Sequence, residues 1–137
     1  MEWNRELLLE KASDIKRAQL SLLEITSQGI EKFLEDPHLI AAAKYELIIS
    51  IEAAISICNH INAKVGERTP ETYADCFILL AQNKIINPDL GDRLAQMAKF
   101  RNLLVHVYSK VDDKRVYQII TENTSDLEEL IKELGLN

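Results

Sequence analysis

Glycine and proline are scarce in this sequence, which argues against a protein built of strands. The 137 residues include 4 glycines and 3 prolines, too few turn formers for a sheet of many strands. Aromatic residues make up 6% and apolar residues 47% of the chain. We therefore expect a core of Leu, Ile, Val and Ala in a single domain of residues 1–137, which is long enough to fold without disulfides.

Membrane and export signals are also missing. No apolar run approaches the roughly 18 residues of a membrane span. Residues 1–6 have neither the basic start nor the apolar run of a signal peptide. We expect a cytoplasmic protein that does not enter a membrane, in which Cys58 and Cys76 are buried thiols rather than a disulfide framework.

The residues that usually bind metals or phosphates form no recognisable motif. The three histidines show no metal-ligand spacing with the cysteines or with paired acids, so we expect no metal and no cofactor. His60 is expected to be a hydrogen-bonded core histidine and His38 a surface residue. No glycine-rich phosphate loop, Ser-His-Asp set or DNA-reading motif is present.

Charge is distributed unevenly along the chain. The net charge of −6 argues mildly against broad nucleic-acid binding, because phosphates require an electropositive surface. Residues 99–115, however, carry a net charge of +3, so the rest of the chain carries −9. This segment is therefore the best candidate for contact with an anionic partner.

Proline marks where helices begin. Each proline follows a residue that caps helices well, in Asp36-Pro37, Thr69-Pro70 and Asn87-Pro88. Together with the apolar periodicity, these signals predict an all-α, up-and-down bundle of five helices. The expected helices span residues 4–33, 37–64, 70–82, 88–108 and 113–134. Residues 47–61 are apolar on nearly every side and predict the central helix.

The helix expected over residues 88–108 carries polar groups where packing favours aliphatic ones. Its inward positions, at spacings of three and four, are Leu90, Leu94, Met97, Arg101, Leu104 and Tyr108. A charge facing a core or a subunit interface must find partners or water. Polar residues at inward helix positions, such as Arg101 and Tyr108 here, often mark functional sites.

Asn102 and His106 are four residues apart and share a face, which Lys99 and Lys110 border. His106 lies about 140° around an ideal helix from Arg101. One helix is therefore expected to hold the two groups apart, unless it loosens near His106 or meets a second copy of itself.

The pattern Arg101-Asn102-x-x-x-His106-x-Tyr108 at the end of a helix resembles the HepT toxins of the HEPN superfamily. The likeness extends over nearly the whole chain, through Ile57-Cys58-Asn59-His60-Ile61, Thr69-Pro70, Tyr73-Ala74-Asp75 and Met97-Ala98-Lys99-Phe100. Two positions differ from many relatives: Leu103 replaces a second basic residue, and Ser109 replaces a tryptophan.

This resemblance implies a HEPN-like homodimer that is the toxin of a toxin–antitoxin pair. The implied activity is metal-independent cleavage of RNA, with no DNA substrate. His106 would act as general acid or base, Arg101 would bind phosphate and Asn102 would orient the pair. Lys99 and Lys110 would bind phosphates of the RNA.

The resemblance also implies control by a partner. An MntA-like nucleotidyltransferase antitoxin would transfer AMP to Tyr108, and the added phosphodiester would block RNA by bulk and repulsion. Two other interpretations stay open. The chain is a non-catalytic module that binds nucleotide or a nucleotidyltransferase, or it is a helical scaffold in which Arg101 is merely ion-paired.

Overall fold

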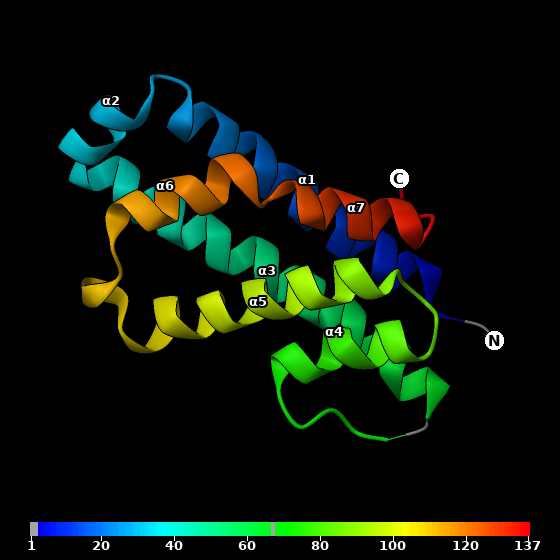
Figure 1. Ribbon diagram of the computed structural model, residues 1–137. Helices are drawn as coiled ribbons and strands as arrows, with labels where there is room; N and C mark the ends of the chain where they lie inside the picture. Colours follow the sequence, from blue (N-terminus) through cyan, green and yellow to red (C-terminus); the bar gives the residue numbers. More distant parts are fainter. Residues whose placement is uncertain (1–2, 67) are drawn as a thin grey trace.

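The computed structural model describes residues 3–66 and 68–137, and all regular structure in these residues is helical. The elements follow in chain order as α1 (Arg5–Thr26), α2 (Ile30–Glu35), α3 (Pro37–Val65), α4 (Tyr73–Gln82), α5 (Pro88–His106), the 3-10 turn η1 (Tyr108–Lys110), α6 (Asp113–Glu122) and α7 (Ser125–Glu133) (Figure 1). The prediction of an all-α fold is confirmed.

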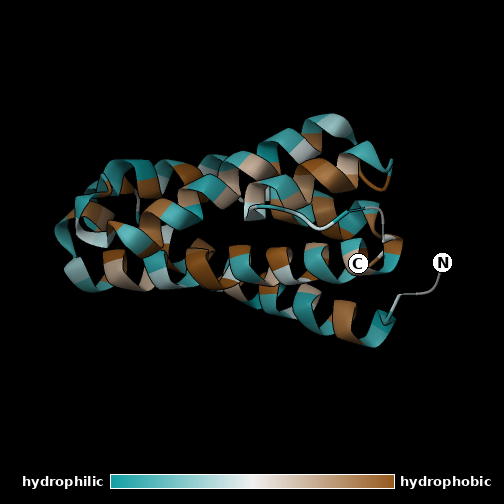
Figure 2. Cartoon of the chain, turned by 90° about the horizontal axis from the view of Figure 1, so that it is seen from below, coloured by the Kyte–Doolittle hydropathy of each residue, from teal (hydrophilic) through white to brown (hydrophobic). Residues whose placement is uncertain are grey.

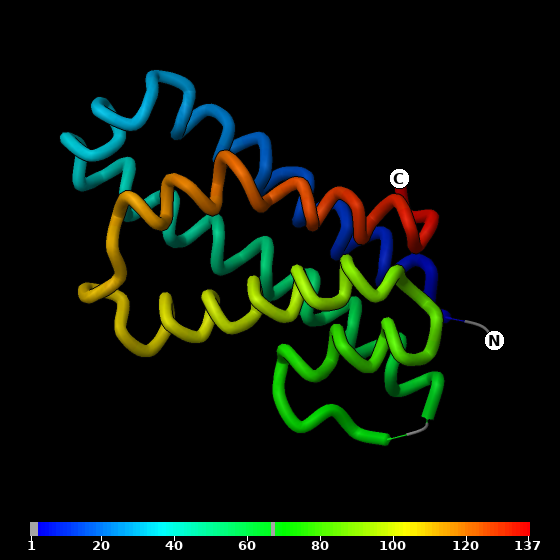
Figure 3. Tube along the Cα trace, in the orientation of Figure 1, coloured from blue at the N-terminus to red at the C-terminus, as the bar shows by residue number. Residues whose placement is uncertain are grey.

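The long helices run side by side and alternate in direction. Helices α1, α3, α5 and the α6–α7 pair form successive passes of a bundle, and the start of α1 lies at the same end as the end of α7 (Figures 1 and 3). The turn η1 lies at the opposite end (Figure 3). Helix α4 packs against α3 and α5 beside the main bundle. The predicted up-and-down topology is thus present, with one shorter helix added to it.

Helix α3 is the central element, as its sequence predicts. Its inner face includes Ile51, Ile57 and Ile61, each at most 1% exposed. Polar and apolar segments alternate along the helices (Figure 2), as expected for helices that each bury one face.

Two of the three proline signals mark helix starts correctly. Asp36 caps α3 and Asn87 caps α5 through side-chain bonds to backbone N–H groups. The start predicted at Pro70 is wrong, because α4 begins at Tyr73. Thr72 is the capping residue there, and its hydroxyl accepts a hydrogen bond from the Asp75 N–H at 3.0 Å.

The helix predicted over residues 4–33 is also interrupted. It ends at Thr26, and Gly29 then adopts a φ of +93°, which is unfavourable for residues with a side chain and redirects the chain into α2.

The helix predicted over residues 113–134 is broken after Glu122. At the break, the Thr124 hydroxyl donates to the Ile120 carbonyl at 2.7 Å. Gln19 of α1 donates to the Thr124 carbonyl at 2.9 Å, and the Leu127 N–H donates to the same carbonyl at 3.0 Å.

Helix α5 ends at His106, two residues earlier than predicted. Val107 leaves the helical conformation, with φ −132° and ψ 41°. Tyr108 therefore lies on η1 rather than on the inward stripe, and it is 43% exposed. No helix among the described residues combines the length and the apolar character needed to cross a membrane.

Candidate functional site

Arg101, Asn102 and His106 line the same hollow of the single chain. This hollow has a volume of about 610 Å³ and lies between the C-terminal half of α5, the N-terminal end of α4 and one residue of α3. Its lining comprises Asn59, Pro70, Glu71, Thr72, Tyr73, Arg101, Asn102, Val105 and His106. We refer to it as the α4–α5 hollow.

Arg101 and His106 both border this hollow, although they lie about 140° apart around α5. Arg101 with Val105, and Asn102 with His106, form two neighbouring rows at a spacing of four residues on α5. Both rows border the hollow because it extends around that side of the helix. Within a single chain, α5 thus contributes both residues to the lining of one hollow.

The Arg101 side chain is held from three directions. One terminal nitrogen, Nη2, donates to the Glu52 carboxylate of α3, and the other, Nη1, donates to Asn102 Oδ1 at 3.1 Å. The guanidinium lies over the Tyr73 ring, with Cζ 5.1 Å from the ring centroid. Its side chain is 14% exposed. Each terminal nitrogen has a second N–H that these bonds do not use.

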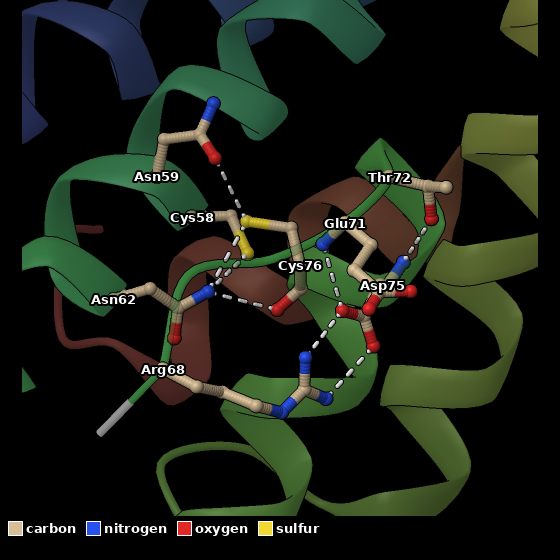
Figure 4. A network of polar contacts seen from close by, with 8 residues as sticks. All are labelled: Cys58, Asn59, Asn62, Arg68, Glu71, Thr72, Asp75 and Cys76. Atoms are coloured by element: carbon tan, nitrogen blue, oxygen red, sulfur yellow. Dashed lines mark hydrogen bonds and ion pairs between the residues drawn. The ribbon is translucent and has the colours of Figure 1, made fainter. Parts of the chain in front are cut away.

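The opposite wall of the hollow is fixed by an ion pair between Arg68 and Asp75 (Figure 4). The guanidinium donates to both carboxylate oxygens, at 2.6 and 2.9 Å, and the Glu71 N–H donates to the same carboxylate at 3.0 Å. These hydrogen bonds lower the pKa of Asp75 to about 2, and the bond from Arg68 has a larger effect than the bond from the Glu71 N–H. These bonds hold the segment that includes Glu71 and Thr72 against α4.

Two thiols lie behind this wall. Asn62 donates to Cys76 Sγ at 3.2 Å and to Cys58 Sγ at 3.6 Å, and Cys76 donates to Asn59 Oδ1 at 3.2 Å (Figure 4). Burial raises the pKa of the Cys58 thiol, while its hydrogen bond to Cys76 lowers the pKa of the latter. The prediction of buried, unpaired cysteines is confirmed.

The other two histidines, His38 and His60, do not line the α4–α5 hollow. His60 Nε2 accepts a hydrogen bond from the Asn4 N–H at 3.1 Å, but the residue is half-buried rather than part of the core. His38 is exposed, as predicted.

The remaining predicted residues lie outside this hollow. Lys99 and Lys110 line a neighbouring hollow of about 380 Å³ together with Leu103, Val107 and Arg115. Lys99 lies seven residues before His106, about 20° away around an ideal helix, but it lines the neighbouring hollow, and Lys110 lies on η1 beyond the end of α5. Tyr108 lies just past the end of α5, where its ring contacts Lys44 of α3.

Glu52 borders Arg101 but could not be predicted from the α5 motif, because it lies on another helix. It belongs to α3, 49 positions before Arg101, and is 43% exposed at its side chain. A signal was nevertheless present, because Glu52 is the one charged residue in the apolar stretch 47–61. An acid in an otherwise apolar stretch of helix indicates a polar partner or contact with water, and here Arg101 is the partner.

Comparison with known proteins agrees with the motif. Residues 8–134 match the model of the family described as "Ribonuclease HepT-like". The chain is 31% identical over 126 residues to the mRNA nuclease HepT of Shewanella oneidensis, covering 92% of this chain and 94% of that protein. The protein therefore belongs to the HepT-like ribonuclease family.

Solved structures agree with this assignment. The chain superimposes with a TM-score of 0.89, at 29% identity, on the tri-AMPylated Shewanella oneidensis HEPN toxin in complex with the MNT antitoxin, covering all of both chains. A toxin–antitoxin structure with AMP-PNP gives the same TM-score and identity, covering 96% of this chain and 99% of that one.

Proposed function

We propose that this protein is the toxin of a toxin–antitoxin pair and that it cleaves RNA at the α4–α5 hollow. The observation that carries this proposal is that Arg101, Asn102 and His106 share one hollow, in which Glu52 and Tyr73 hold the guanidinium in place. Membership of the HepT-like family and the mRNA nuclease activity of the Shewanella relative support it. We also propose that residues 1–137 form one domain that acts in the cytoplasm.

The reaction requires proton transfer and charge stabilisation rather than an enzyme nucleophile. The RNA 2′-oxygen attacks its own neighbouring phosphorus and the bond from phosphorus to the 5′-oxygen breaks, which leaves a 2′,3′-cyclic phosphate and a 5′-hydroxyl. A base accepts the 2′-OH proton and an acid protonates the departing 5′-oxygen. His106, exposed at the hollow, serves one of these roles because imidazole exchanges protons near neutral pH.

Arg101 binds the phosphate of the cleaved linkage. Its unused terminal N–H groups offer a forked pair of donors to two phosphate oxygens. Because Glu52 and Tyr73 fix the guanidinium before RNA arrives, little reorganisation is needed as charge builds up in the transition state. Asn102 accepts from Arg101 Nη1 and so helps to orient it.

We propose that Lys99 and Lys110 bind phosphates that flank the cleaved linkage. Both lysines are exposed and line the adjacent hollow on α5. RNA that crosses the end of α5 would contact both hollows of one protomer, or one hollow of each protomer in the homodimer that we also propose.

Regulation is proposed to act through Tyr108 and an MntA-like nucleotidyltransferase antitoxin, by analogy with the tri-AMPylated toxin complex. The phenol oxygen attacks the α-phosphorus of ATP, a new O–P bond forms, and the bond to the β-phosphate breaks to release pyrophosphate. A base of the antitoxin takes the phenolic proton. Each adenylate adds a negative charge beside the surface that receives RNA.

A cleavage assay tests the activity. Purified protein is expected to cut RNA with chelator present and to leave 2′,3′-cyclic phosphate ends, whereas Arg101→Ala and His106→Ala do not. Expression of the wild-type chain should arrest growth, and either substitution should relieve the arrest. Absence of cleavage by pure, folded protein would favour the non-catalytic binding module.

A mass measurement tests the regulation. The chain expressed with its antitoxin is expected to gain mass in steps of one adenylate, and Tyr108→Phe should abolish the gain. An unchanged mass in the wild-type chain, or a gain that persists in Tyr108→Phe, contradicts the assignment.

A further inference from the structure

Lys44 is a charged residue buried inside the bundle. It lies on the inner face of α3, and its side chain is only 6% exposed. Lysine is almost never fully buried unless its ammonium group is paired, because the charge loses its hydration. The neighbouring inward positions Ala43 and Leu47 are apolar, so packing alone would favour an aliphatic residue here.

Within residues 3–66 and 68–137, the side-chain polar contacts of Lys44 are made with one short segment. Its Nζ donates to the Tyr108 carbonyl oxygen at 3.1 Å and lies 3.3 Å from Asp113 Oδ1. The same ammonium lies over the Tyr108 ring, 4.4 Å from the centroid. Tyr108 begins η1 and Asp113 begins α6. Lys44 thus ties the connection between α5 and α6 to the central helix.

The contacts act on both the backbone and the side chain of Tyr108. The backbone bond fixes where the residue lies, and the attraction between the cation and the ring face favours one orientation of the ring. The residue nevertheless remains 43% exposed. Without the ammonium, an exposed tyrosine on a short 3-10 turn would be free to change its side-chain rotamer.

We propose that Lys44 is a positioning residue that presents the Tyr108 phenol to the nucleotidyltransferase antitoxin. The proposal rests on the function proposed above, since it assumes that Tyr108 accepts AMP. Among the described residues, the polar contacts of Lys44 are with Tyr108 and Asp113, neither of which lines the α4–α5 hollow, so we assign its role to regulation and not to RNA cleavage. Orientation of a reacting group contributes to rate because a displaced nucleophile reaches the attack geometry less often.

The experiment compares Lys44→Met with the wild-type chain. Methionine keeps an unbranched apolar stem of similar length and removes the charge, and Asp113, whose side chain is 39% exposed, can be hydrated instead. Purified chain is incubated with ATP, Mg²⁺ and the antitoxin, and the rate of mass gain is followed. RNA cleavage by the unmodified chain and the thermal melting temperature are measured in parallel.

We expect AMP transfer to Lys44→Met to be slower by about tenfold or more, with RNA cleavage within about twofold of wild type. Lys44→Arg keeps a donor and a cation and should recover most of the transfer rate. Asp113→Asn is the matched control: it weakens the ion pair but leaves both Tyr108 contacts, and it should be modified nearly as fast as wild type. Lys44→Gln is measured alongside, in case methionine impairs folding.

Transfer at the wild-type rate to a folded, uncharged Lys44 variant overturns the positioning role. So does an equal loss in Lys44→Arg, or a loss of RNA cleavage that matches the loss of transfer, because either would indicate a general structural defect. If the wild-type chain gains no mass with an active antitoxin, the proposed regulation itself fails and this inference fails with it.

Discussion

Replacing Arg101 by lysine separates the role of the guanidinium in catalysis from its role in stability. Lysine keeps a positive charge beside Glu52 but cannot donate through a planar fork or lie flat on the Tyr73 ring. The contacts of Arg101 allow the change in the free energy of unfolding and the change in kcat to be estimated.

In Arg101→Lys, the stabilising contacts that are lost nearly balance a destabilising buried group that is removed. The substitution loses the hydrogen bond to Asn102 and weakens the one to Glu52, at about 1 kcal/mol each. It also removes Arg101 Nε, a buried donor with no hydrogen-bond partner among the described residues, whose desolvation costs about 1–3 kcal/mol. Glu52 is 43% exposed at its side chain and can be hydrated. We expect the free energy of unfolding to change by no more than about 1 kcal/mol.

The catalytic effect is expected to be larger. Loss of one preorganised donor to a developing charge lowers kcat by roughly 10²–10³-fold. Cleavage is measured in single turnover on a labelled RNA, and stability by urea unfolding of the same preparation. Arg17→Lys on the exposed face of α1, where the side chain is 72% exposed, is the control and should change neither quantity.

Wild-type cleavage by Arg101→Lys would refute the assignment of Arg101 to the phosphate. A loss of several kcal/mol of stability that accompanies the lost activity would instead show that the residue acts as a structural ion pair. The helical-scaffold interpretation predicts the loss of stability, and it predicts no RNA cleavage by the wild-type chain.

Two further predictions concern the contacts that hold α4 in place. Gly91→Ala should destabilise the protein by about 1–3 kcal/mol, because a Cβ there would lie 2.7 Å from the Ala81 Cβ and force α4 away from α5; urea unfolding measures this. Acidification should remove the stability contributed by Asp75, whose folded-state pKa of about 2 lies below its ordinary value. That contribution is complete above about pH 4 and is lost as the pH falls through about 2, and solvent screening keeps it below about 1 kcal/mol. Comparison of wild type with Asp75→Asn over this pH range measures it.

Each of these predictions has an outcome that contradicts it. A Gly91→Ala variant as stable as wild type would mean that α4 can move away from α5 without loss of packing. A stability difference between Asp75→Asn and wild type that is independent of pH would mean that the carboxylate charge does not help to hold α4 in place.

Much of the bundle could be predicted because the signals are local. The caps at Asp36 and Asn87, each followed by proline, mark helix starts wherever the chain folds. The uniformly apolar stretch 47–61 identifies the central helix for the same reason. The errors concern where helices begin and end. Some have local causes, such as the positive φ of Gly29 and the cap at Thr72, whereas at the break near Thr124 a residue of another helix, Gln19 of α1, bonds the Thr124 carbonyl.

The sequence by itself determined the helical class, the central position of α3 and the anomaly at Arg101, since periodicity and capping are read along the chain. Only the tertiary structure decided what surrounds Arg101. Glu52 and Tyr73 lie on other helices, and the packing of α4 beside α5 opens a hollow that includes His106. It also placed Tyr108 outside α5 and against Lys44, because the helix ends at His106 and the turn that follows is bound from α3. Contacts between residues tens of positions apart depend on how helices pack, which no local pattern encodes.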